Sequence, residues 1–459
     1  MGPGGREWGE AVVTLRFGTD GIRGRDVELA PELIVALGRS AARVLAPAPG
    51  SHFVIGRDTR RSGPAIEAAL AAGLAAEGVE VARLGVLPTP GVAWVSATRH
   101  VPGAMISASH NQFCDNGIKF FAPGGRKLSD GAEAALEAAL DANLARPATA
   151  AAATPPGHID DRDESAGYAE QVLGALEGRR LDGLSVVVDP AHGAASAIAP
   201  GVLARAGSDV HVLHAAPDGT NINDRCGSTH PEALQRAVVE RGADLGLALD
   251  GDADRVIAVD HEGALVDGDQ LLVVLALDLR ARGRLRRDTV VVTVMANLGL
   301  HRALAEHDIS VVETPVGDRH VLGALERTGG SLGGEQSGHL VLPDLATTGD
   351  GLLSGLLVAD VVRRSGRPLA ELASAMTRLP QVLRSVRVAR REAGEAEPWR
   401  AEVAAVAGEL GADGRVLVRP SGTEPVVRIM VEAPQADRAE QLARRLAAAI
   451  ERSGGGPTG

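Results

Sequence analysis

The chain has 459 residues, which at about 150 residues per domain corresponds to roughly three domains. A net charge of −12 argues against nucleic acids or anionic membranes as partners, and the absence of a long apolar run predicts no transmembrane helix. The two cysteines, Cys114 and Cys226, have no second cysteine nearby, which excludes disulfide frameworks and CxxC sites and favours a cytoplasmic location.

Short apolar runs alternate along the chain with longer amphipathic stretches. The predicted strands of the first three quarters cover residues 53–55, 79–84, 104–107, 184–188, 209–213, 244–249, 289–294 and 309–313. The predicted helices cover residues 63–77, 132–144, 193–205, 232–241, 267–282, 298–306 and 318–327. This alternation predicts an α/β protein whose sheets are mixed or mostly parallel and are covered by helices.

Composition shifts predict the boundaries between domains. Residues 145–157 form an Ala/Thr/Pro-rich linker, and weaker breaks lie near residues 260–263 and 379–381. The resulting division is a disordered extension over 1–13 and four domains over 14–155, 156–260, 261–379 and 380–453, followed by a frayed tail. The first three domains each contain a strand, a turn and then a helix, whereas the last reads as a smaller α+β domain.

An acidic loop follows the strand that ends near residue 249. Asp250, Asp252 and Asp254 are spaced at alternate positions and can present three oxygens to one hard divalent cation. An EF-hand loop is excluded because its sixth and twelfth positions would be Arg255 and His261. A solvated acidic turn is the alternative to a metal site.

A second loop, residues 105–111, combines Ser109 and His110 after a strand. A capped turn is the structural alternative, because adjacent residues seldom place the His on the Ser oxygen. The strand that follows carries Lys119, one of the two lysines of the chain, between Ile118 and Phe120. Partial desolvation there would lower its pKa and suit it to proton transfer, and a structural ion pair is the alternative.

Four further loops carry groups suited to phosphates and sugars. The glycine-rich stretch 17–24 contains Arg23, with neither Rossmann nor Walker spacing. The stretch 333–339 pairs a carboxylate with a hydroxyl near His339, and residues 316–320 form another polar loop. Residues 419–428 place two guanidiniums and two hydroxyls around a tight turn, as a phosphate pocket requires. For the last three of these loops, an ordinary polar turn is the alternative.

In their order along the chain, the loop with Ser109, the loop with the three aspartates, the loop 333–339 and the loop 419–428 resemble those of the α-D-phosphohexomutase family, and the resemblance extends over about residues 14–450. The segments that carry the resemblance are 106–111, 115–121, 221–224, 226–232, 317–319 and 334–339. The stretch Asn221-Ile-Asn-Asp224 and the Cys226-Gly-Ser-Thr that follows are most similar to the bacterial branch acting on glucosamine phosphates. The resemblance implies three similar α/β domains with mixed sheets and a smaller C-terminal α+β domain, arranged around a central cleft.

The resemblance also implies a role for each loop. Ser109 is expected to carry a phosphoryl group and, with Asp250, Asp252 and Asp254, to hold one Mg²⁺ per chain. The remaining catalytic residues are expected to be Arg23, Lys119, His110 and His339. The residues expected to bind the sugar and the phosphate that is not reacting are Arg255, Asp318, Arg319, Glu335, Ser337, Arg419, Ser421, Gly422, Thr423 and Arg428. The four domains would thus be the phosphoserine, metal, sugar and phosphate domains.

The implied reaction interconverts glucosamine 6-phosphate and glucosamine 1-phosphate through a 1,6-bisphosphate intermediate, a step toward UDP-N-acetylglucosamine. A hexosamine or hexose 1,6-bisphosphate is the expected activator, and a small sugar phosphate is the expected partner of a monomer or homodimer. Two alternatives remain open. One is the same chemistry on mannose or glucose phosphates, and the other is a catalytically inactive sugar-phosphate sensor.

Overall fold

The computed structural model describes residues 17–18, 21–48, 50–145, 155–388, 397–420 and 426–453. The predicted extension over 1–13, most of the linker and the tail beyond 453 lie outside the described residues. The chain divides into two compact units, one made of Met1–Thr293 with Val312–Ala373 and the other of Val294–Val311 with Ser374–Gly459. No helix in the described ranges is long and apolar enough to cross a membrane.

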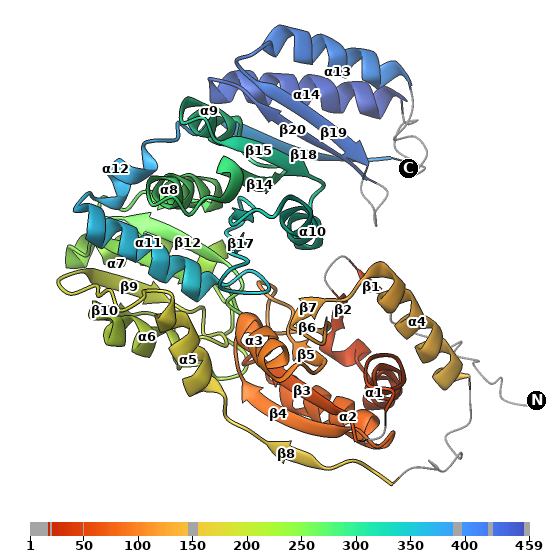
Figure 1. Cartoon of the computed structure of the whole chain (residues 1–459). Helices are drawn as coiled ribbons and strands as arrows, with labels where there is room; N and C mark the ends of the chain where they lie inside the picture. The colour runs from red at the N-terminus through yellow and green to blue at the C-terminus, as the bar shows by residue number, and fades with distance from the viewer. Residues whose placement is uncertain are drawn as a thin grey trace, which may run out of the picture. The chain divides into compact units, whose positions relative to one another are not determined.

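The first sheet of the larger unit is mixed, with the strand order β1-β2-β6-β5-β3-β4-β8 and β7 paired to β6 (Figure 1). Its strands are β1 (Phe17–Gly18), β2 (Gly21–Arg25), β3 (His52–Arg57), β4 (Glu80–Val86), β5 (Gly103–Ile106), β6 (Asp115–Ala122), β7 (Arg126–Lys127) and β8 (Ile159–Asp161). β3 is parallel to β4 and β5, whereas β6 runs antiparallel to β5 and β2. Both β5 and β6 are almost entirely buried, so the loops at their ends are held on a rigid base.

Helices cover this sheet. α1 (Pro31–Leu45), α2 (Gly63–Ala75) and α4 (Asp130–Leu144) share one hydrophobic core with the strands, and α3 (Thr89–Arg99) packs against β3 and β5. Gly38 of α1 and Gly73 of α2 let these two helices approach closely, because a Cβ atom at either position would lie 2.5 Å or less from a backbone oxygen of the other helix.

The second sheet has the order β10-β9-β11-β12-β13. Its strands are β9 (Ser185–Asp189), β10 (Asp209–Val212), β11 (Leu245–Leu249), β12 (Val256–Asp260) and β13 (Leu265–Val266). β9, β10 and β11 are parallel, so their carboxyl ends meet at one edge of the sheet. The helices of this part are α5 (Ser165–Gly174), α6 (Ala199–Ala206) and α7 (Glu232–Arg241).

The third sheet has the order β15-β14-β16-β17. Its strands are β14 (Thr289–Thr293), β15 (Ser310–Thr314), β16 (Gly333–Gly334) and β17 (Leu340–Val341). The helices of this region are α8 (Gly268–Ala281), α10 (Asp318–Thr328), α11 (Gly351–Ser365) and α12 (Leu369–Ala373). α8 begins with a capping box in which Asp267 accepts from the Gln270 N–H, and α11 begins where Asp350 accepts from the Leu353 N–H at 2.9 Å.

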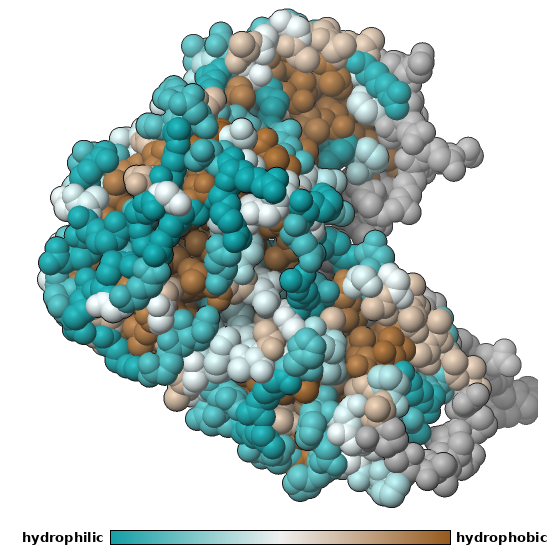
Figure 2. Space-filling model, viewed as in Figure 1, coloured by the Kyte–Doolittle hydropathy of each residue, from teal (hydrophilic) through white to brown (hydrophobic). Residues whose placement is uncertain are grey.

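The smaller unit contains α9 (Leu298–Glu306) and a three-stranded antiparallel sheet. β18 (Gln381–Arg387) and β19 (Arg415–Pro420) flank β20 (Val426–Glu432), and α13 (Glu397–Leu410) and α14 (Ala436–Ser453) complete its core. Most of the surface in view is hydrophilic, but a hydrophobic area lies around β19 and β20 (Figure 2). Leu383 of β18 is 61% exposed, which fits a small sheet with one open face.

The predicted α/β class, with three helix-covered sheets and a smaller C-terminal α+β part, is confirmed. The helix predicted over 193–205 is too long, since α6 begins only at Ala199. Residues 193–198 form successive turns instead, because Ala194 donates to the carbonyl of Gly251 at 2.8 Å and Gly193 lies against the same residue. The tertiary contact overrides the helical pattern there.

Candidate active site

Ser109 lies in the loop that connects β5 to β6. Its side chain is 1% exposed, and its hydroxyl donates to Oδ2 of Asp250 at 2.6 Å. The residue has a φ of +52°, in the left-handed region that non-glycine residues seldom adopt. Its backbone N–H donates to Oγ of Ser107 at 2.8 Å, which supports this conformation. The structure thus brings the predicted serine loop and the predicted metal loop into direct contact.

The three acidic residues of the metal loop form a buried cluster after β11. One ligand oxygen from each of Asp250, Asp252 and Asp254 lies within 4.8 Å of the others. Burial, followed by the charges of Asp254 and Asp252, raises the pKa of Asp250. Oδ1 of Asp252 and Oδ1 of Asp254 are buried and accept no hydrogen bond from the described residues. Buried carboxylate oxygens without donors fit a hard divalent cation such as Mg²⁺ and disfavour a solvated acidic turn.

Lys119 and Arg255 supply positive charge to this cluster. Lys119 lies in β6 opposite Met105, is 4% exposed, and places Nζ 2.9 Å from Oδ2 of Asp252 and 3.4 Å from Oδ2 of Asp254. Burial alone would raise the pKa of Asp254, but Lys119, His339 and Arg255 together outweigh burial and hold that pKa well below its ordinary value. A buried ion pair therefore fixes Lys119 beside the predicted metal ligands.

His110 follows Ser109 in the loop, and Arg23 is close enough for its charge to act on the His110 imidazole. Nδ1 of His110 is 3.3 Å from the Ser109 hydroxyl oxygen and accepts from Nη1 of Arg255 at 3.2 Å. Burial, then the charges of Arg255 and Arg23, lowers the pKa of His110 to about 4, so this imidazole is neutral near pH 7. Arg23 is an exposed residue of β2 that pairs with Gly117 of β6.

The predicted sugar loop connects β16 to β17 and contacts the strand that leaves the metal loop. The N–H of Val256 donates to the carbonyl of Gly338 at 3.0 Å, while Oε1 of Glu335 accepts from the Gly317 N–H at 3.2 Å. Ser337 is exposed. Glu335 and Ser337 therefore belong to a loop whose backbone is anchored beside Asp254 and Arg255.

His339 is 2% exposed and lies between two carboxylates. Its Nδ1 is 3.7 Å from Oδ2 of Asp254, and its Nε2 is 3.6 Å from Oδ2 of Asp318. Burial alone would lower the pKa of His339, but Asp254 and Asp318 together raise it above its ordinary value. His339 therefore links the metal loop to the beginning of α10.

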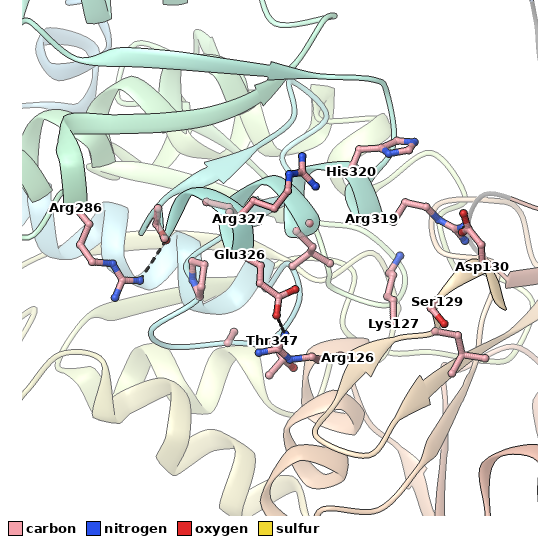
Figure 3. A pocket seen from close by; sticks show the side chains of 18 residues that line it. Arg126, Lys127, Ser129, Asp130, Arg286, Arg319, His320, Glu326, Arg327 and Thr347 are labelled. Atoms are coloured by element: carbon pink, nitrogen blue, oxygen red, sulfur yellow. Dashed lines mark hydrogen bonds and ion pairs between the residues drawn. The ribbon is translucent and has the colours of Figure 1, made fainter. Parts of the chain in front are cut away.

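Arg319, next to Asp318 at the beginning of α10, lines a cavity of about 690 Å³ that is bounded by β7, α4 and α10 (Figure 3). Nη1 of Arg319 bonds Asp130 at 2.6 Å and its Nη2 bonds Glu133 at 2.8 Å, while Asp318 pairs with Lys127. Both predicted substrate-binding residues are thus held in ion pairs. Sequence reasoning missed these partners, because no local pattern joins α10 to α4.

In the smaller unit, Arg419 of β19 lies directly opposite Arg428 of β20. Burial, then the charge of Arg428, lowers the pKa of Arg419. Both arginines line a cavity of about 250 Å³ together with Met295, Leu383 and Leu417. Two neighbouring guanidiniums favour an anion between them. The predicted residues Ser421, Gly422 and Thr423 lie outside the described residues.

Thr89 is a further contact of the metal loop that the sequence did not reveal. It is the first residue of α3, its hydroxyl donates to Oδ2 of Asp252 at 2.7 Å, and its N–H donates to the carbonyl of Asp252 at 2.9 Å. The Pro-Thr-Pro sequence around it indicates a helix start. Nothing in that signal points to a loop more than 160 residues away.

A second cluster that could bind a metal contains Asp189, His214 and Cys226, at the same edge of the second sheet. Asp189 already accepts from Nδ1 of His214 at 2.8 Å and from the N–H groups of Ala191 and Gly227 at 2.9 and 3.0 Å. These hydrogen bonds account for its buried carboxylate, so we interpret this cluster as a support for the surrounding loops.

Four family descriptions match consecutive parts of the chain. They are phosphoglucomutase/phosphomannomutase alpha/beta/alpha domains I, II and III and the C-terminal domain, over residues 14–146, 166–263, 267–379 and 373–449. Together they span most of the sequence, in the order that the family requires.

Individual proteins agree with this assignment. A phosphoglucosamine mutase from Salinispora tropica is 52% identical over 437 residues, which cover 94% of this chain and 97% of that protein. The crystal structure of a phosphoglucomutase/phosphomannomutase family protein from Burkholderia thailandensis has a TM-score of 0.79 at 24% identity, covering 96% of this chain and 97% of the other. An Aspergillus fumigatus N-acetylphosphoglucosamine mutase, solved with GlcNAc-6P and magnesium, has a TM-score of 0.71 at 20% identity, covering 96% of each chain. The chain therefore belongs to the α-D-phosphohexomutase superfamily and, within it, to the bacterial phosphoglucosamine mutases.

Proposed function

We propose that this enzyme interconverts glucosamine 6-phosphate and glucosamine 1-phosphate through a phosphorylated Ser109. The observation that carries the proposal is the 2.6 Å hydrogen bond between the Ser109 hydroxyl and Asp250, inside a buried cluster of three carboxylates. A hydroxyl fixed beside a cation site is the arrangement that phosphoryl transfer needs, since positioning and charge stabilisation supply most of its catalysis.

The transfer moves one phosphoryl group between two oxygens. The bond from phosphorus to Ser109 Oγ breaks as a bond to a sugar hydroxyl oxygen forms, and the proton of that hydroxyl leaves to a base. The resulting 1,6-bisphosphate then reorients in the site, so that its other phosphate faces Ser109. The reverse step at that end returns a phosphoryl group to Ser109. Each half-reaction is balanced, so a net isomerisation requires no external phosphate.

Different residues of the site are proposed to bind the cation, to stabilise charge and to transfer protons. Asp250, Asp252 and Asp254 would hold Mg²⁺, which when bound neutralises negative charge on the phosphoryl oxygens. Lys119 is proposed to stabilise the same charge, because its ammonium already lies within 3.4 Å of two of these carboxylates. The neutral His110 and the buried His339 are the proposed proton carriers near the serine and the sugar loop.

The remaining predicted residues are proposed to bind the substrate. Glu335 and Ser337 would orient two sugar hydroxyls, and Arg419 with Arg428 would bind the phosphate that is not reacting. Arg255, Asp318 and Arg319 would contact the substrate from the metal loop and α10, which requires Arg319 to exchange its carboxylate partners. Arg23 is proposed to flank the transferring group.

A hexosamine or hexose 1,6-bisphosphate is the proposed activator, because an unphosphorylated Ser109 needs a donor before its first turnover. A cytoplasmic location and a small sugar phosphate as the partner, without nucleic acid, complete the proposal. It is consistent with the net charge of −12 and the two free cysteines.

The decisive experiment compares the turnover of glucosamine, glucose and mannose 6-phosphates with Mg²⁺ and glucose 1,6-bisphosphate. We expect the highest kcat/KM for glucosamine 6-phosphate, and a preference for glucose or mannose would reject the proposed substrate. Intact-mass measurement after incubation with glucose 1,6-bisphosphate is the companion test. A wild-type protein that gains no phosphoryl group on Ser109 and isomerises none of the sugars would instead be a sugar-phosphate sensor.

A further inference from the structure

The Asn221–Asp224 segment has no role in the mechanism above, yet it contacts the catalytic serine. Asn223 is 4% exposed, and its Nδ2 donates to the carbonyl of Ser109 at 2.8 Å and to the carbonyl of Asn111 at 2.9 Å. A side-chain amide nitrogen has two N–H donors, so both are used on this loop. Asn223 thereby connects the second sheet's loops to the serine loop, 114 residues away in sequence.

Arg60 binds the same two carbonyls. Its Nη2 donates to the carbonyls of Ser109 and Asn111, each at 2.9 Å, and its Nη1 donates to that of Asp115 at 2.9 Å. The side chain is 0% exposed, and its Nε donates to Oδ2 of Asp58 at 2.8 Å. Arg60 and Asn223, which we call the carbonyl clamp, therefore make four hydrogen bonds to two neighbouring carbonyls.

Asp58 extends the clamp to the serine's own N–H group. Its Oδ2 accepts from the Ser107 hydroxyl at 2.7 Å, and Oγ of Ser107 accepts from the Ser109 N–H at 2.8 Å. Both backbone polar groups of Ser109 are thus bonded to buried side chains. This matters because a φ of +52° is unfavourable for serine and persists only where the surroundings impose it.

The metal loop packs directly on the clamp. A Cβ atom at Gly251, between two of the metal-loop carboxylates, would lie 2.7 Å from Nδ2 of Asn223 and 2.7 Å from the Ser109 carbonyl oxygen. The Asn223 amide therefore occupies the space where the serine loop and the metal loop meet, and a displacement of either loop would disturb the contact between Ser109 and Asp250.

The position of Asn223 is itself fixed. Its φ is +58°, its N–H donates to the carbonyl of Ala191 at 3.0 Å, and the N–H of Ala191 donates to Oδ1 of Asp189 at 2.9 Å. Asp189 also accepts from the N–H of Gly227, beyond the other end of the turn. The cluster of Asp189, His214 and Cys226 thus supports a rigid turn that presents one amide to the serine loop.

We propose that Asn223, together with Arg60, is a positioning residue for phosphoryl transfer, which holds Ser109 in its left-handed conformation so that Oγ faces the metal ligands. This proposal rests on the proposed function of Ser109. Among the described residues of the larger unit, neither clamp residue forms a hydrogen bond with Glu335 or Ser337, which are proposed to bind the sugar hydroxyls. Loss of the Asn223 amide should therefore lower kcat and slow phosphorylation of Ser109, while the KM for the sugar phosphate changes little.

The test compares two variants with a matched control. Asn223→Asp replaces both donors by an acceptor beside two carbonyl oxygens, and Asn223→Gly removes the amide while glycine tolerates the positive φ and preserves the fold. The control, Asn221→Asp, makes the same chemical change on the same turn, where the hydrogen bonds of the side chain within the described part of the chain are to Ala216 and Asp218. Each purified full-length protein is assayed with glucosamine 6-phosphate, Mg²⁺ and glucose 1,6-bisphosphate.

We expect kcat to fall about 100-fold in both Asn223 variants, as for a misplacement of about 1 Å, with KM within about threefold of the wild type. Intact mass should show slower Ser109 phosphorylation by glucose 1,6-bisphosphate in the Asn223 variants, whereas Asn221→Asp should match the wild type in every readout. Asn223→Gly with wild-type kcat and wild-type phosphorylation would overturn the clamp, as would an increase in KM alone.

One further measurement and one further variant separate a loss of positioning from a loss of the fold. Thermal unfolding of Asn223→Gly shows whether the fold is retained, and Arg60→Lys tests the other half of the clamp, since one ammonium cannot reproduce the planar set of donors. A wild-type protein without mutase activity would reject the proposed function. The phosphorylation rates of Ser109 would still decide whether Asn223 positions it.

Discussion

Replacing Lys119 by methionine should separate its electrostatic role in the fold from its role in catalysis. Methionine preserves the length and most of the apolar stem of lysine but removes the ammonium. The two carboxylates at 2.9 and 3.4 Å, Asp252 and Asp254, are 0 and 5% exposed and lose their nearest cation. At an effective dielectric constant of about 20, each contact at these distances is worth roughly 5 to 6 kcal/mol before desolvation.

The net cost is smaller, because desolvation of the ammonium is no longer required. Removing one partner of a buried ion pair typically costs about 3–5 kcal/mol, which lowers the Tm by about 6 °C or more in a large domain. Mg²⁺ should reverse part of this loss. The variant's cluster carries one more uncompensated negative charge, so it should bind the cation more tightly than the wild type does. At a concentration of 100 Kd the ion adds about 2.7 kcal/mol.

The assay is calorimetric or fluorescence-detected unfolding of the full-length protein, with EDTA and with a series of Mg²⁺ concentrations, alongside mutase activity. We expect a lower Tm in EDTA, a larger Mg²⁺-induced rise than in the wild type, and a loss of kcat of about 100-fold or more. Lys127→Met, which alters the other lysine and its pair with Asp318, should leave the Mg²⁺-induced rise unchanged. If Lys119→Met unfolds at the wild-type temperature in EDTA, or gains no more from Mg²⁺ than the wild type, the electrostatic reasoning is refuted.

Three further predictions follow from the same geometry. Ser109→Ala should show no mutase activity and no mass increase with glucose 1,6-bisphosphate; activity above the background of the uncatalysed reaction would contradict a phosphoserine mechanism. Glu335→Gln should raise the KM for glucosamine 6-phosphate about tenfold, as for a lost hydrogen bond to a charged group, and an unchanged KM would remove Glu335 from the sugar site. Burial raises the pKa of Asp350 to about 6 against hydrogen bonds from the Leu353 N–H and the Tyr168 hydroxyl. Because this folded-state pKa lies above the unfolded value of about 3.9, the stability that Asp350 contributes is complete at low pH and is lost as pH rises through about 6. The stability of the wild type relative to Asp350→Asn should therefore fall by about 2 kcal/mol between about pH 4.5 and 7.5, measured by urea unfolding; a pH-independent difference would contradict the assigned burial.

Much of the site could be predicted from sequence because its reactive side chains are grouped in short segments of the chain. Asp250, Asp252 and Asp254 follow a buried strand within five residues, and Ser109 follows another. Since carboxyl ends of strands collect at sheet edges, such segments point to functional loops without knowledge of the fold. The alternation of strands and helices predicted the α/β class in the same local way.

The remaining parts depend on contacts between distant segments, which no local pattern encodes. The amide of Asn223 meets the carbonyl of Ser109 only after two separate sheets have packed. Arg319 acquires carboxylate partners from α4, and Gly193 lies against Gly251, so that the helix predicted over 193–205 begins only at Ala199. In each case the missing information is the packing of loops, not the character of the residues.

The cramped position of Gly251 has a consequence for changing the enzyme's substrate by directed evolution. An added methyl group there would press on two atoms that are each fixed by hydrogen bonds, so neither can move aside cheaply. Single substitutions at Gly251 or Asn223 will therefore mostly yield inactive clones, because each displaces a residue of another loop. A library would be better spent on the loop that carries Glu335 and the exposed Ser337, where side chains can change without moving the serine.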